Sequence, residues 1–410
     1  MKPLLPVSDA LAAILENANQ LDGEFVPLEN AADRVLTGDL AALRTQPPFF
    51  ASAMDGYAVR HTDLGAIPVA LKVVGEAGAG HPYIGEINSG ECIRIFTGAP
   101  VPESADTIIM QENTERESNS STFVKILQSA PEGKFIRKKG LDFEEGNILL
   151  KAGSLLNPAS ISLAAAMNHA KLNVVRKPRV AIIATGDELL PPGSELGPGQ
   201  IIASNSFGVA AIVEKYGGVA LDIGIVKDTI AAHENAFAKT IELEADILVT
   251  LGGASVGEHD LVQKTLLSIG ARMDFWRIAM RPGKPLMFGA LPHSRGSMHF
   301  LGLPGNPVSS LICSTLFLIP LISALAGRPY EQLTETAILG NDLPENDQRQ
   351  DYLRASLSID SDGKLRAMPF VAQDSSMLSL MAHADCLIVR PPFAPAANAG
   401  DGCNFVRLKS

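Results

Sequence analysis

The feature that most constrains this sequence is an alternation of short apolar runs with helical patterns between residues 174 and 325. We predict that the apolar runs are strands, and the clearest are Val180–Ala184, Val219–Val226, Ile247–Leu251, Phe275–Met280, Pro285–Gly289 and Met298–Leu303. We predict helices in the segments between them, at Phe207–Tyr216, Ala231–Leu243 and Leu261–Ile269. Continuous apolar strands that alternate with helices indicate a mostly parallel sheet covered on both faces.

The flanking segments have different patterns of apolar residues. Residues 4–43 carry apolar side chains at helical spacing and predict two helices, one around Ala10–Leu15 and one around Ala31–Leu36. Residues 53–147 contain short β-rich runs between glycines and prolines, and a helical pattern returns at Leu155–Leu172. Residues 331–410 again read as strands and turns, which predicts a small β domain or barrel.

The composition excludes several classes of protein. Hydrophobic residues make up 46% of the 410 residues and charged residues 19%, which is typical of a folded chain rather than a disordered one. The formal net charge of −11 makes the chain a poor general binder of nucleic acid, because neutralising phosphates requires a basic face. An anionic ligand must therefore be held by local basic clusters.

Cysteine usage and the apolar segments predict a cytoplasmic protein. The four cysteines are scattered without a CxxC pair, which fits a reducing compartment. The N-terminal segment has the pattern of an amphipathic helix and not of a signal peptide. The most apolar stretch, Ser309–Gly327, is about long enough to span a membrane, but Pro320 and several hydroxyl side chains favour a buried core helix.

Unusual loops follow three of the predicted strands. They are Thr185-Gly-Asp-Glu188, Gly252-Gly-Ala-Ser-Val-Gly-Glu-His-Asp260 and Pro304-Gly-Asn-Pro-Val-Ser-Ser310. Ligands of open α/β sheets bind at the carboxyl ends of the strands, where glycines let backbone amides approach an anion. Carboxylates beside such a loop are natural Mg²⁺ ligands. A single glycine pair is often only a turn, and Glu188 or Asp260 alone could be a cap, but three such loops in one sheet predict a site.

Two basic clusters interrupt the acidic background. The first, Lys134–Gly140, reads equally well as a solvated charged face. The second, Arg277–Pro285, contains Arg281 and Lys284 on either side of a Pro-Gly bend, and we predict that it binds an anion. Asp55 lies in an Asp-Gly pair and could be only a turn residue.

Several common sites have no support in the sequence. There is no GxxxxGK[ST] phosphate loop, and no GxGxxG follows a strand. The histidines lack metal-ligand spacing, so structural zinc is not expected.

Taken together, the motifs resemble the molybdopterin molybdenumtransferase family, which is related to the C-terminal domain of gephyrin. They are SAMDGYA at 52–58, RIFTGAPVP at 94–102, RKKGLD at 137–142, TGDE at 185–188, LGGASVGEHD at 251–260, RPGKP at 281–285 and LPGNPVS at 303–309. They occur in the family's order, and the resemblance covers about residues 5–405.

The resemblance implies an enzyme that inserts molybdate into adenylated molybdopterin with release of AMP, and it implies that Mg²⁺ is required. It also implies a homodimer whose cleft is formed by both subunits, and a molybdopterin adenylyltransferase as partner enzyme. The implied fold is multidomain α/β plus β, with a three-layer α/β domain. The implied domains are a mixed helical domain (1–46 and 143–173), an inserted β domain (47–142), the α/β molybdopterin-binding domain (174–327) and a C-terminal β-barrel (328–410).

The resemblance also assigns site residues. The implied catalytic acids are Asp55, Glu188, Asp228 and Asp260, of which Glu188, Asp228 and Asp260 are the expected metal ligands. The implied substrate-binding residues are Thr97, Arg137, Asp142, Ser255, Arg281, Lys284, Ser309, Arg354 and Ser376, with Ser375 as the alternative to Ser376.

The sequence departs from the family pattern at three places. The usual RRRGED is Arg137-Lys-Lys-Gly-Leu-Asp142 here, and lysine lacks the planar fork of arginine. The first cation of the usual KPGKP is Arg281, which keeps the charge. Asp374 stands where the family usually has glycine, so the transfer of a role to Ser375 or Ser376 is the least direct.

Two other functions fit parts of the sequence. The adenylyltransferase that makes the adenylated pterin shares the α/β domain, but the flanking regions and the SAMDGYA segment argue against that enzyme. A gephyrin-like clustering module needs no catalytic acids, whereas this chain keeps the complete acidic set.

Overall fold

The computed structural model describes residues 4–116, 122–253, 261–293, 296–331 and 334–409. The chain divides into two compact units. Unit 1 comprises residues 1–24, 33–35 and 174–410, and unit 2 comprises residues 25–32 and 36–173. Each unit is described by itself below.

A six-stranded sheet forms the centre of unit 1, in the order β16-β13-β17-β21-β20-β18. Its strands are β13 (Arg179–Thr185), β16 (Val219–Val226), β17 (Ile247–Leu251), β18 (Arg272–Arg277), β20 (Pro285–His293) and β21 (Gly296–Leu303). The first four strands in the sheet order are parallel, whereas β20 and β18 run antiparallel to their neighbours. The sheet is therefore mostly parallel, as the alternating pattern predicts.

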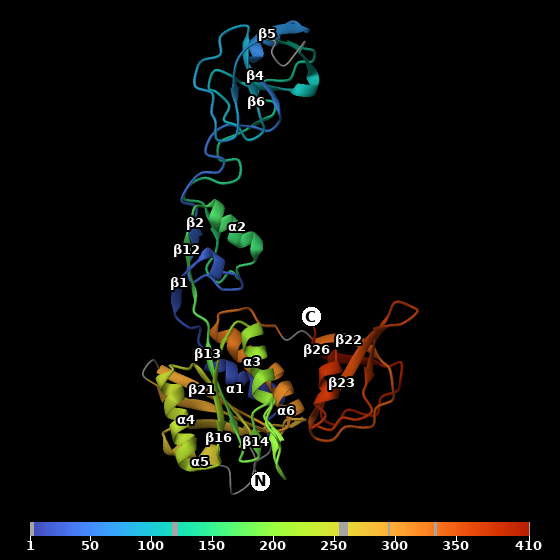
Figure 1. The fold of residues 1–410 in the computed structure, drawn as a ribbon. Helices are drawn as coiled ribbons and strands as arrows, with labels where there is room; N and C mark the ends of the chain where they lie inside the picture. Colours follow the sequence, from blue (N-terminus) through green and yellow to red (C-terminus); the bar gives the residue numbers. More distant parts are fainter. Residues whose placement is uncertain (1–3, 117–121, 254–260, 294–295, 332–333, 410) are drawn as a thin grey trace. The chain divides into compact units, whose positions relative to one another are not determined.

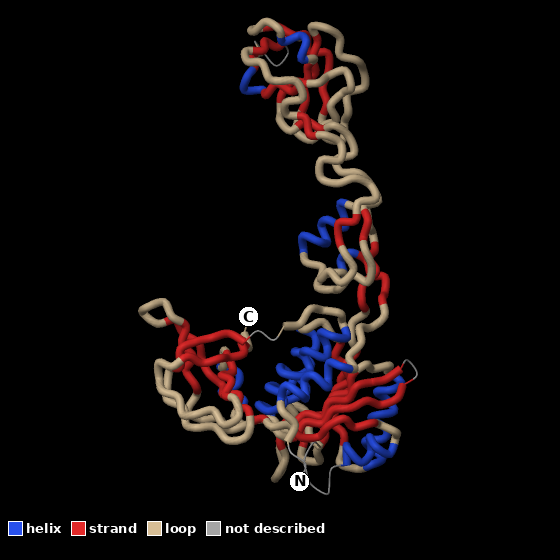
Figure 2. The backbone as a smooth tube through the Cα atoms, turned by 180° about the vertical axis from the view of Figure 1, so that it is seen from behind, coloured by secondary structure: helices blue, strands red, loops and turns tan. Residues whose placement is uncertain are grey.

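Helices cover both faces of this sheet (Figures 1 and 2). They are α1 (Val7–Glu16), α3 (Asn205–Lys215), α4 (Ile230–Glu242), α5 (Leu261–Ser268), α6 (Pro307–Cys313) and α7 (Ile319–Leu325). Along β13, Val180 and Ile182 pack in the core with α1, α3, α6 and α7, while Ala181 and Ile183 pack in the core with α4 and α5. Side chains alternate between the two faces of a strand, so a strand with a core on each side must be apolar throughout.

The apolar segment Pro307–Leu325 is a core helix. Its length and composition would suffice to cross a membrane, but 83% of its most apolar window is buried inside the protein. The helix widens to a π-helical segment at Ser314–Leu318, just before Pro320. Proline has no amide hydrogen and clashes with the preceding turn of an α-helix, so a wider turn accommodates it.

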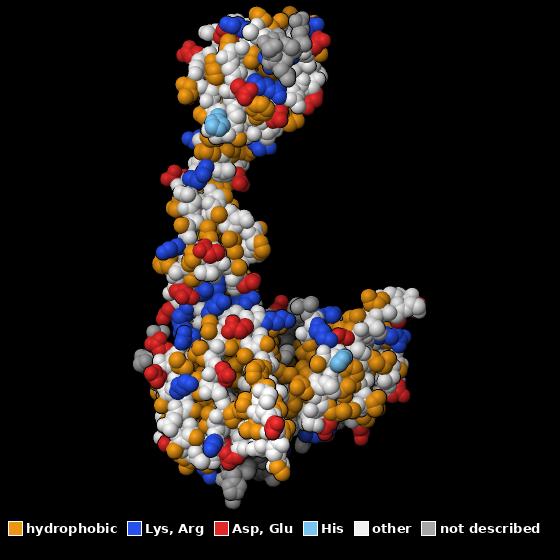
Figure 3. Space-filling view, in the orientation of Figure 1, with side chains coloured by type: hydrophobic (Ala, Val, Ile, Leu, Met, Phe, Trp, Pro, Cys, Tyr) orange, Lys and Arg blue, Asp and Glu red, His pale blue; other side chains and the backbone are white. Residues whose placement is uncertain are grey.

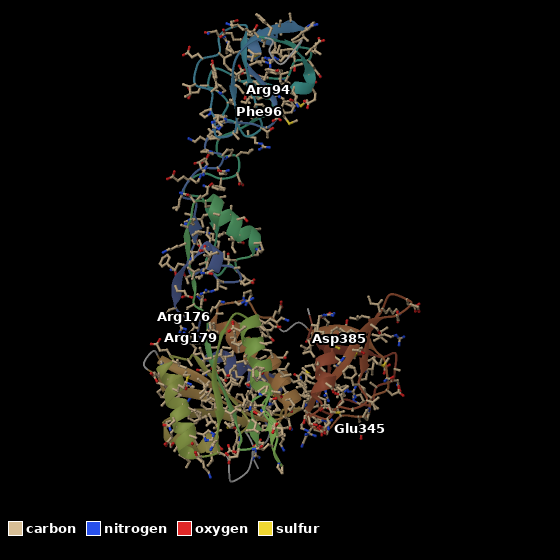
Figure 4. The ribbon with its side chains drawn as sticks, in the orientation of Figure 1. Arg94, Phe96, Arg176, Arg179, Glu345 and Asp385 are labelled. Atoms are coloured by element: carbon tan, nitrogen blue, oxygen red, sulfur yellow. The ribbon has the colours of Figure 1, made fainter. Side chains whose placement is uncertain are left out.

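An ion pair aligns the amino ends of β13 and β17. The Asp246 carboxylate accepts two hydrogen bonds from the Arg176 guanidinium, at 2.6 and 2.7 Å, and one from the Arg179 amide at 2.8 Å. Arg176 and Arg179 are labelled in Figure 4. The geometry is bidentate and largely buried, which makes it more specific than a surface pair. It fixes the register at the end of the sheet opposite to the predicted site.

The C-terminal part of unit 1 is a closed five-stranded barrel. The strands β23-β24-β22-β26-β25 follow one another, and β25 pairs back with β23. They are β22 (Thr334–Leu339), β23 (Gln350–Ile359), β24 (Leu365–Pro369), β25 (Cys386–Arg390) and β26 (Gly402–Arg407), with helix α8 (Leu378–His383) before β25. The short strand β19 (Met280–Arg281) pairs with β23 and joins the barrel to the α/β part.

Unit 2 contains a second six-stranded sheet, in the order β7-β4-β6-β5-β9-β8. Its strands are β4 (Gly56–Val59), β5 (Val69–Ala77), β6 (Glu91–Ile95), β7 (Thr107–Met110), β8 (Thr114–Glu115) and β9 (Phe123–Ile126). The remaining elements of the chain are β1 (Gly23–Pro27), β2 (Leu40–Ala41), β3 (Ala51–Ser52), β10 (Ile136–Arg137), β11 (Ile148–Leu150), α2 (Pro158–Ala166), β12 (Lys171–Val175), β14 (Leu189–Leu190), β15 (Ile201–Ile202) and the 3₁₀ turns Leu28–Asn30, His61–Leu64 and Gln111–Asn113.

One predicted helix is wrong. The segment around Ala31–Leu36 is not helical, although Ala31, Val35 and Leu36 are buried. Its backbone instead bonds to distant segments: the Leu36 amide donates to the Ser154 carbonyl at 3.0 Å, and the Val35 carbonyl accepts from Val175 at 2.8 Å. Pairing with these segments satisfies the backbone outside a helix, and apolar spacing alone could not reveal it.

Candidate functional site

A cavity of about 1270 Å³ lies in unit 1 at the carboxyl ends of β13, β17 and β21. All three predicted loops contribute to its lining, through Gly186, Gly252–Gly253 and Gly305–Asn306. The lining extends from Asp228, after β16, to Lys284, before β20. Four strand spacings of about 4.8 Å separate β16 from β20, so the two ends of the cavity lie about 19 Å apart.

Glycines are required where the loops approach one another. Gly252 and Gly253 have φ angles of 96° and 65°, in the left-handed region that other residues adopt at a cost. A Cβ atom on Gly253 would lie 2.4 Å from the Val262 side chain, and one on Gly252 would lie 2.9 Å from the Thr185 carbonyl oxygen. Close contacts with neighbouring residues therefore require these two glycines, in addition to the turn itself.

One end of the cavity, which we call the acidic end, carries the lining carboxylates Glu188 and Asp228. The Asp187 carboxylate accepts a hydrogen bond of 3.2 Å from the Asp228 amide. Partial desolvation, and then the nearby Asp187 and Glu188 charges, raise the pKa of the Asp228 carboxyl above its ordinary value, although His233 opposes this shift. Like charges held close together destabilise the protein and mark a candidate site for a cation.

Two predicted residues of the glycine loop, Ser255 and Asp260, lie outside the described residues. Within the described part of the chain, no group of three His, Cys, Asp or Glu side chains is placed to hold a metal ion. The donors that are present, Glu188 and Asp228, are hard oxygen ligands of the kind that Mg²⁺ prefers. Their chemistry therefore fits the expected ion.

The opposite end of the cavity, which we call the basic end, has one lining cation among the described residues, Lys284. Ser376 also lines the cavity, from a loop that bonds to Asn306 and Val308 after β21, the strand next to β20. Glu188, Asp228, Lys284 and Ser376 are thus brought together around one cavity, although they are far apart in the sequence.

Arg281 does not line the cavity. Its guanidinium donates to both carboxylate oxygens of Asp351, one of them at 2.9 Å, and approaches Asp347 at 3.5 Å. Asp351 is buried, and it is the residue opposite Arg281 where β19 pairs with β23. In this structure the Arg281 side chain holds the barrel against the α/β part.

Arg354 is also engaged elsewhere, because it is 1% exposed in the barrel. Its guanidinium donates to the backbone carbonyls of Asp374 and Met377, at 2.9 and 3.1 Å, and to the Gln373 side chain. Burial lowers the pKa of Arg354. The side chain supports the 373–377 loop from inside the barrel.

Ser309 is buried in the first turn of α6, and it is not part of the cavity lining. Ser375 bonds toward the neighbouring loop: its hydroxyl accepts a hydrogen bond of 3.1 Å from the Asn306 side chain, and its carbonyl accepts from the Val308 amide. Ser376, rather than Ser375, therefore faces the cavity.

The other predicted residues lie in unit 2. The Asp55 carboxylate accepts hydrogen bonds of 2.7 Å from both the amide and the hydroxyl of Thr97, and these bonds lower its pKa. Arg137 lies on β10 opposite Ala51, and the Asp142 amide donates to the Gln46 carbonyl. The two segments SAMDGYA and RIFTGAPVP thus meet through Asp55 and Thr97. The Arg94 guanidinium lies over the Phe96 ring beside them (Figure 4).

Thr185 and His233 are among the lining residues that the sequence reasoning did not assign to the site. Both are buried, and the Thr185 hydroxyl and His233 Nε2 have no hydrogen-bond partner among the described residues. Thr185 begins a motif that we singled out and could have been included. His233 lies inside α4 and had no signal in the sequence.

On the face shown in Figure 3, acidic and basic side chains are interspersed over both units. This face has no continuous basic patch of the kind that neutralises a nucleic-acid backbone.

Comparison with known families gives three matches along the chain. Residues 181–324 match a probable molybdopterin binding domain, residues 5–168 match the MoeA N-terminal region (domain I and II), and residues 336–408 match the MoeA C-terminal region (domain IV). The α/β part that carries the cavity is therefore of the molybdopterin-binding class.

Individual relatives resemble the whole chain. A molybdopterin molybdenumtransferase of Haemophilus influenzae is 35% identical over 92% of this chain and 92% of its own length. One from Nostoc sp. is 38% identical over 83% of this chain and 78% of its own length. The crystal structure of the molybdopterin biosynthesis moea protein from Pyrococcus horikosii has a TM-score of 0.83 and 30% identity, with full coverage of both chains. The chain belongs to the molybdopterin molybdenumtransferase family.

Proposed function

We propose that this protein inserts molybdate into adenylated molybdopterin and releases AMP. The observation that carries the proposal is the polarity of the cavity, with Glu188 and Asp228 at one end and Lys284 and Ser376 at the other. The family relatives are named as molybdenumtransferases, which supports the same reaction.

The two reactants repel each other, since molybdate is a dianion and the adenylated pterin carries a pyrophosphate. Lys284 would attract molybdate to the basic end, and Ser376 would orient it. In adenylated molybdopterin the dithiolene and the adenosine lie on opposite sides of the pyrophosphate. One extended substrate could therefore use both ends of a cavity about 19 Å long.

Glu188 and Asp228, together with Asp260, would hold Mg²⁺ at the acidic end. When bound, this ion would neutralise the pyrophosphate and polarise its phosphorus. Water would attack the pyrophosphate, so that the phosphoanhydride bond breaks and AMP leaves while the pterin keeps its own phosphate. The two dithiolene sulfurs would replace an oxygen of molybdate, which leaves as water with the thiol protons, and sulfur suits the soft-ligand preference of molybdenum. In unit 2, Thr97 would hold Asp55 ionised and oriented for the substrate.

The remaining assignments belong to the same proposal. We assign substrate-binding roles to Arg137, Asp142 and Ser255. The resemblance assigns such roles to Arg281, Ser309 and Arg354 as well, but these three do not line the cavity and would act by supporting the residues that do. We also propose the four-domain division given above. A homodimer in the cytoplasm, supplied by an adenylyltransferase partner, completes the proposal. Light scattering of the purified chain tests the dimer, because a mass of one chain would contradict it.

The reaction is tested by incubating the full chain with adenylated molybdopterin, molybdate and Mg²⁺, and by measuring AMP chromatographically. AMP release should require both molybdate and Mg²⁺. Release that ignores molybdate would overturn the proposal. Formation of adenylated pterin from ATP and the free pterin would instead identify an adenylyltransferase.

A further inference from the structure

The loop that carries Ser376 is anchored on both sides. From inside the barrel, the buried Arg354 guanidinium holds the carbonyls of Asp374 and Met377. From the α/β part, Asn306 and Val308 donate to Ser375. The loop is therefore positioned before any ligand arrives, and Ser376 lies at the cavity wall.

Both hydrogen-bond donors of Ser376 are already occupied. Its amide and its hydroxyl donate to the same Asp374 oxygen, at 2.8 and 2.6 Å. These bonds hold the pKa of Asp374 below its ordinary value, so the carboxylate is charged at neutral pH. A backbone N–H and a hydroxyl that converge on one oxygen are the kind of donor pair that binds an oxyanion. Here a carboxylate of the protein occupies this pair.

The neighbouring cations make their hydrogen bonds elsewhere. Arg281 is paired with Asp351 and Asp347, and the Arg354 guanidinium bonds to backbone carbonyls, although its charge attracts Asp374. Among the described residues, Lys284 is the cation that lines the cavity. Ser376 therefore holds a negative charge at the cavity wall where the oxyanion is expected.

We propose that Asp374 sets the oxyanion affinity of the basic end by competing with the ligand for the two donors of Ser376. This inference rests on the proposed function, in which Lys284 and Ser376 bind molybdate. An incoming dianion must displace the Asp374 carboxylate from Ser376 or bind beside a like charge. In both cases, the wild type should bind the oxyanion less tightly than a variant that has the same donors and a neutral residue at position 374.

Titration calorimetry of the full chain with sodium molybdate tests this inference. Asp374→Asn keeps an oxygen that accepts both Ser376 bonds and removes only the charge, so the Kd should fall about fivefold. Asp374→Ala also frees the two donors, and its Kd should fall by a further factor of about three. Asp360→Asn is a matched control, because Asp360 likewise accepts amide hydrogen bonds in a barrel turn but does not line the cavity. It should leave the Kd unchanged.

Combining substitutions separates competition from simple charge repulsion. Ser376→Ala should weaken molybdate binding less in the wild-type background than in the Asp374→Ala background, since Asp374 already holds the hydroxyl in the wild type. In the Asp374→Ala background, Ser376→Ala should remove the gain that comes from the freed hydroxyl. A large loss of affinity in the wild-type background would show that the hydroxyl is available without competition, and the inference would be wrong.

Equal molybdate affinities in the wild type, Asp374→Asn and Asp374→Ala would also overturn it. If Asp374→Ala unfolds at a lower temperature, Asp374→Asn decides, because it preserves the loop hydrogen bonds. AMP release measured on the same preparations separates the two proposals. Molybdate-dependent release with equal affinities would overturn the role of Asp374 alone. A wild type that neither binds molybdate nor releases AMP would overturn both.

Discussion

The two ends of the cavity differ in how their charged side chains are paired. At the acidic end, partial burial and then the nearby charges of Asp187 and Glu188 raise the pKa of Asp228. Near the basic end, Arg281 is paired with acids and Arg354 is bonded to carbonyls, so Lys284 alone of these cations faces the cavity. Paired charges help to stabilise the fold, whereas the cavity charges that have no ion-pair partner among the described residues, which we call unpaired, are candidates for binding a ligand.

The largest effect is expected from removing an unpaired acid. Asp228→Asn should lower AMP release by about 10²–10³-fold, because a proposed ligand of the ion that neutralises the pyrophosphate is lost. Its melting temperature should stay the same or rise, since a repulsive charge is removed. Glu188→Ala and Asp260→Ala should also abolish AMP release.

A suitable control for this effect is Asp222→Asn, also on the β16 segment, where the carboxylate accepts a bond from Gly224 and does not line the cavity. It should keep the wild-type rate. If Asp228→Asn turned over normally, Asp228 would have no part in the mechanism.

The next effect concerns the unpaired cation. Lys284→Ala should raise the KM for molybdate about 10- to 100-fold, the range expected when a charge-assisted bond is lost, with a smaller change in kcat. Lys284→Arg should restore part of the affinity. Steady-state rates at varied molybdate measure both, and an unchanged molybdate dependence would contradict the assignment.

A paired cation should behave differently. Arg281→Ala leaves the buried Asp351 without its partner and should lower the free energy of unfolding by about 1–3 kcal/mol, with allowance for the exposure of Arg281. Adding Asp351→Asn should recover part of this loss, and denaturant unfolding measures both variants. If Arg281→Ala kept its stability but raised the KM for molybdate, Arg281 would be a ligand of the oxyanion after all.

The smallest effect is a difference in pH dependence. The folded-state pKa of Asp228 is raised above 3.8, so its contribution to stability is present at low pH and is lost as the pH rises through that folded pKa. The Arg349 side chain and amide lower the pKa of Asp347 to about 2, so its contribution is present above 3.8 and is lost as the pH falls through about 2.

Relative to the wild type, Asp228→Asn should therefore gain stability as the pH rises. Asp347→Asn should instead lose stability relative to the wild type as the pH rises from about 2 to 3.8. Calorimetric melting temperatures across the acidic and neutral range measure both trends. Parallel curves for the two variants would remove the distinction between the paired and unpaired acids.

Much of the fold was predictable where the burial of a strand can be inferred from the strand's own residues. The predicted bounds of β16, Val219–Val226, and of β17, Ile247–Leu251, are confirmed. β17 lies inside the sheet and is buried along its whole length, so it must be apolar on both faces, which the sequence displays directly. The helix around Ala31–Leu36 failed because its backbone partners, such as Ser154, lie more than a hundred residues away.

The candidate site was predictable to the extent that it follows the rule that ligands of open α/β sheets bind at the carboxyl ends of the strands. That rule placed the TGDE, glycine-pair and PGNP loops together, and all three line the cavity. It could not show that Arg281 turns to Asp351, which lies 70 residues away, or that His233 reaches the cavity from α4.

The sequence by itself determined the family, the order of elements and the chemical types of the site residues, because these follow from local pattern and motif. Tertiary structure decided which of those residues stay free. A guanidinium or a hydroxyl has no fixed role until its hydrogen-bond partners are known, and for Arg281, Arg354 and Ser376 the fold supplies those partners. Competition for hydrogen bonds in three dimensions therefore separates the residues that bind a ligand from those that hold the protein together.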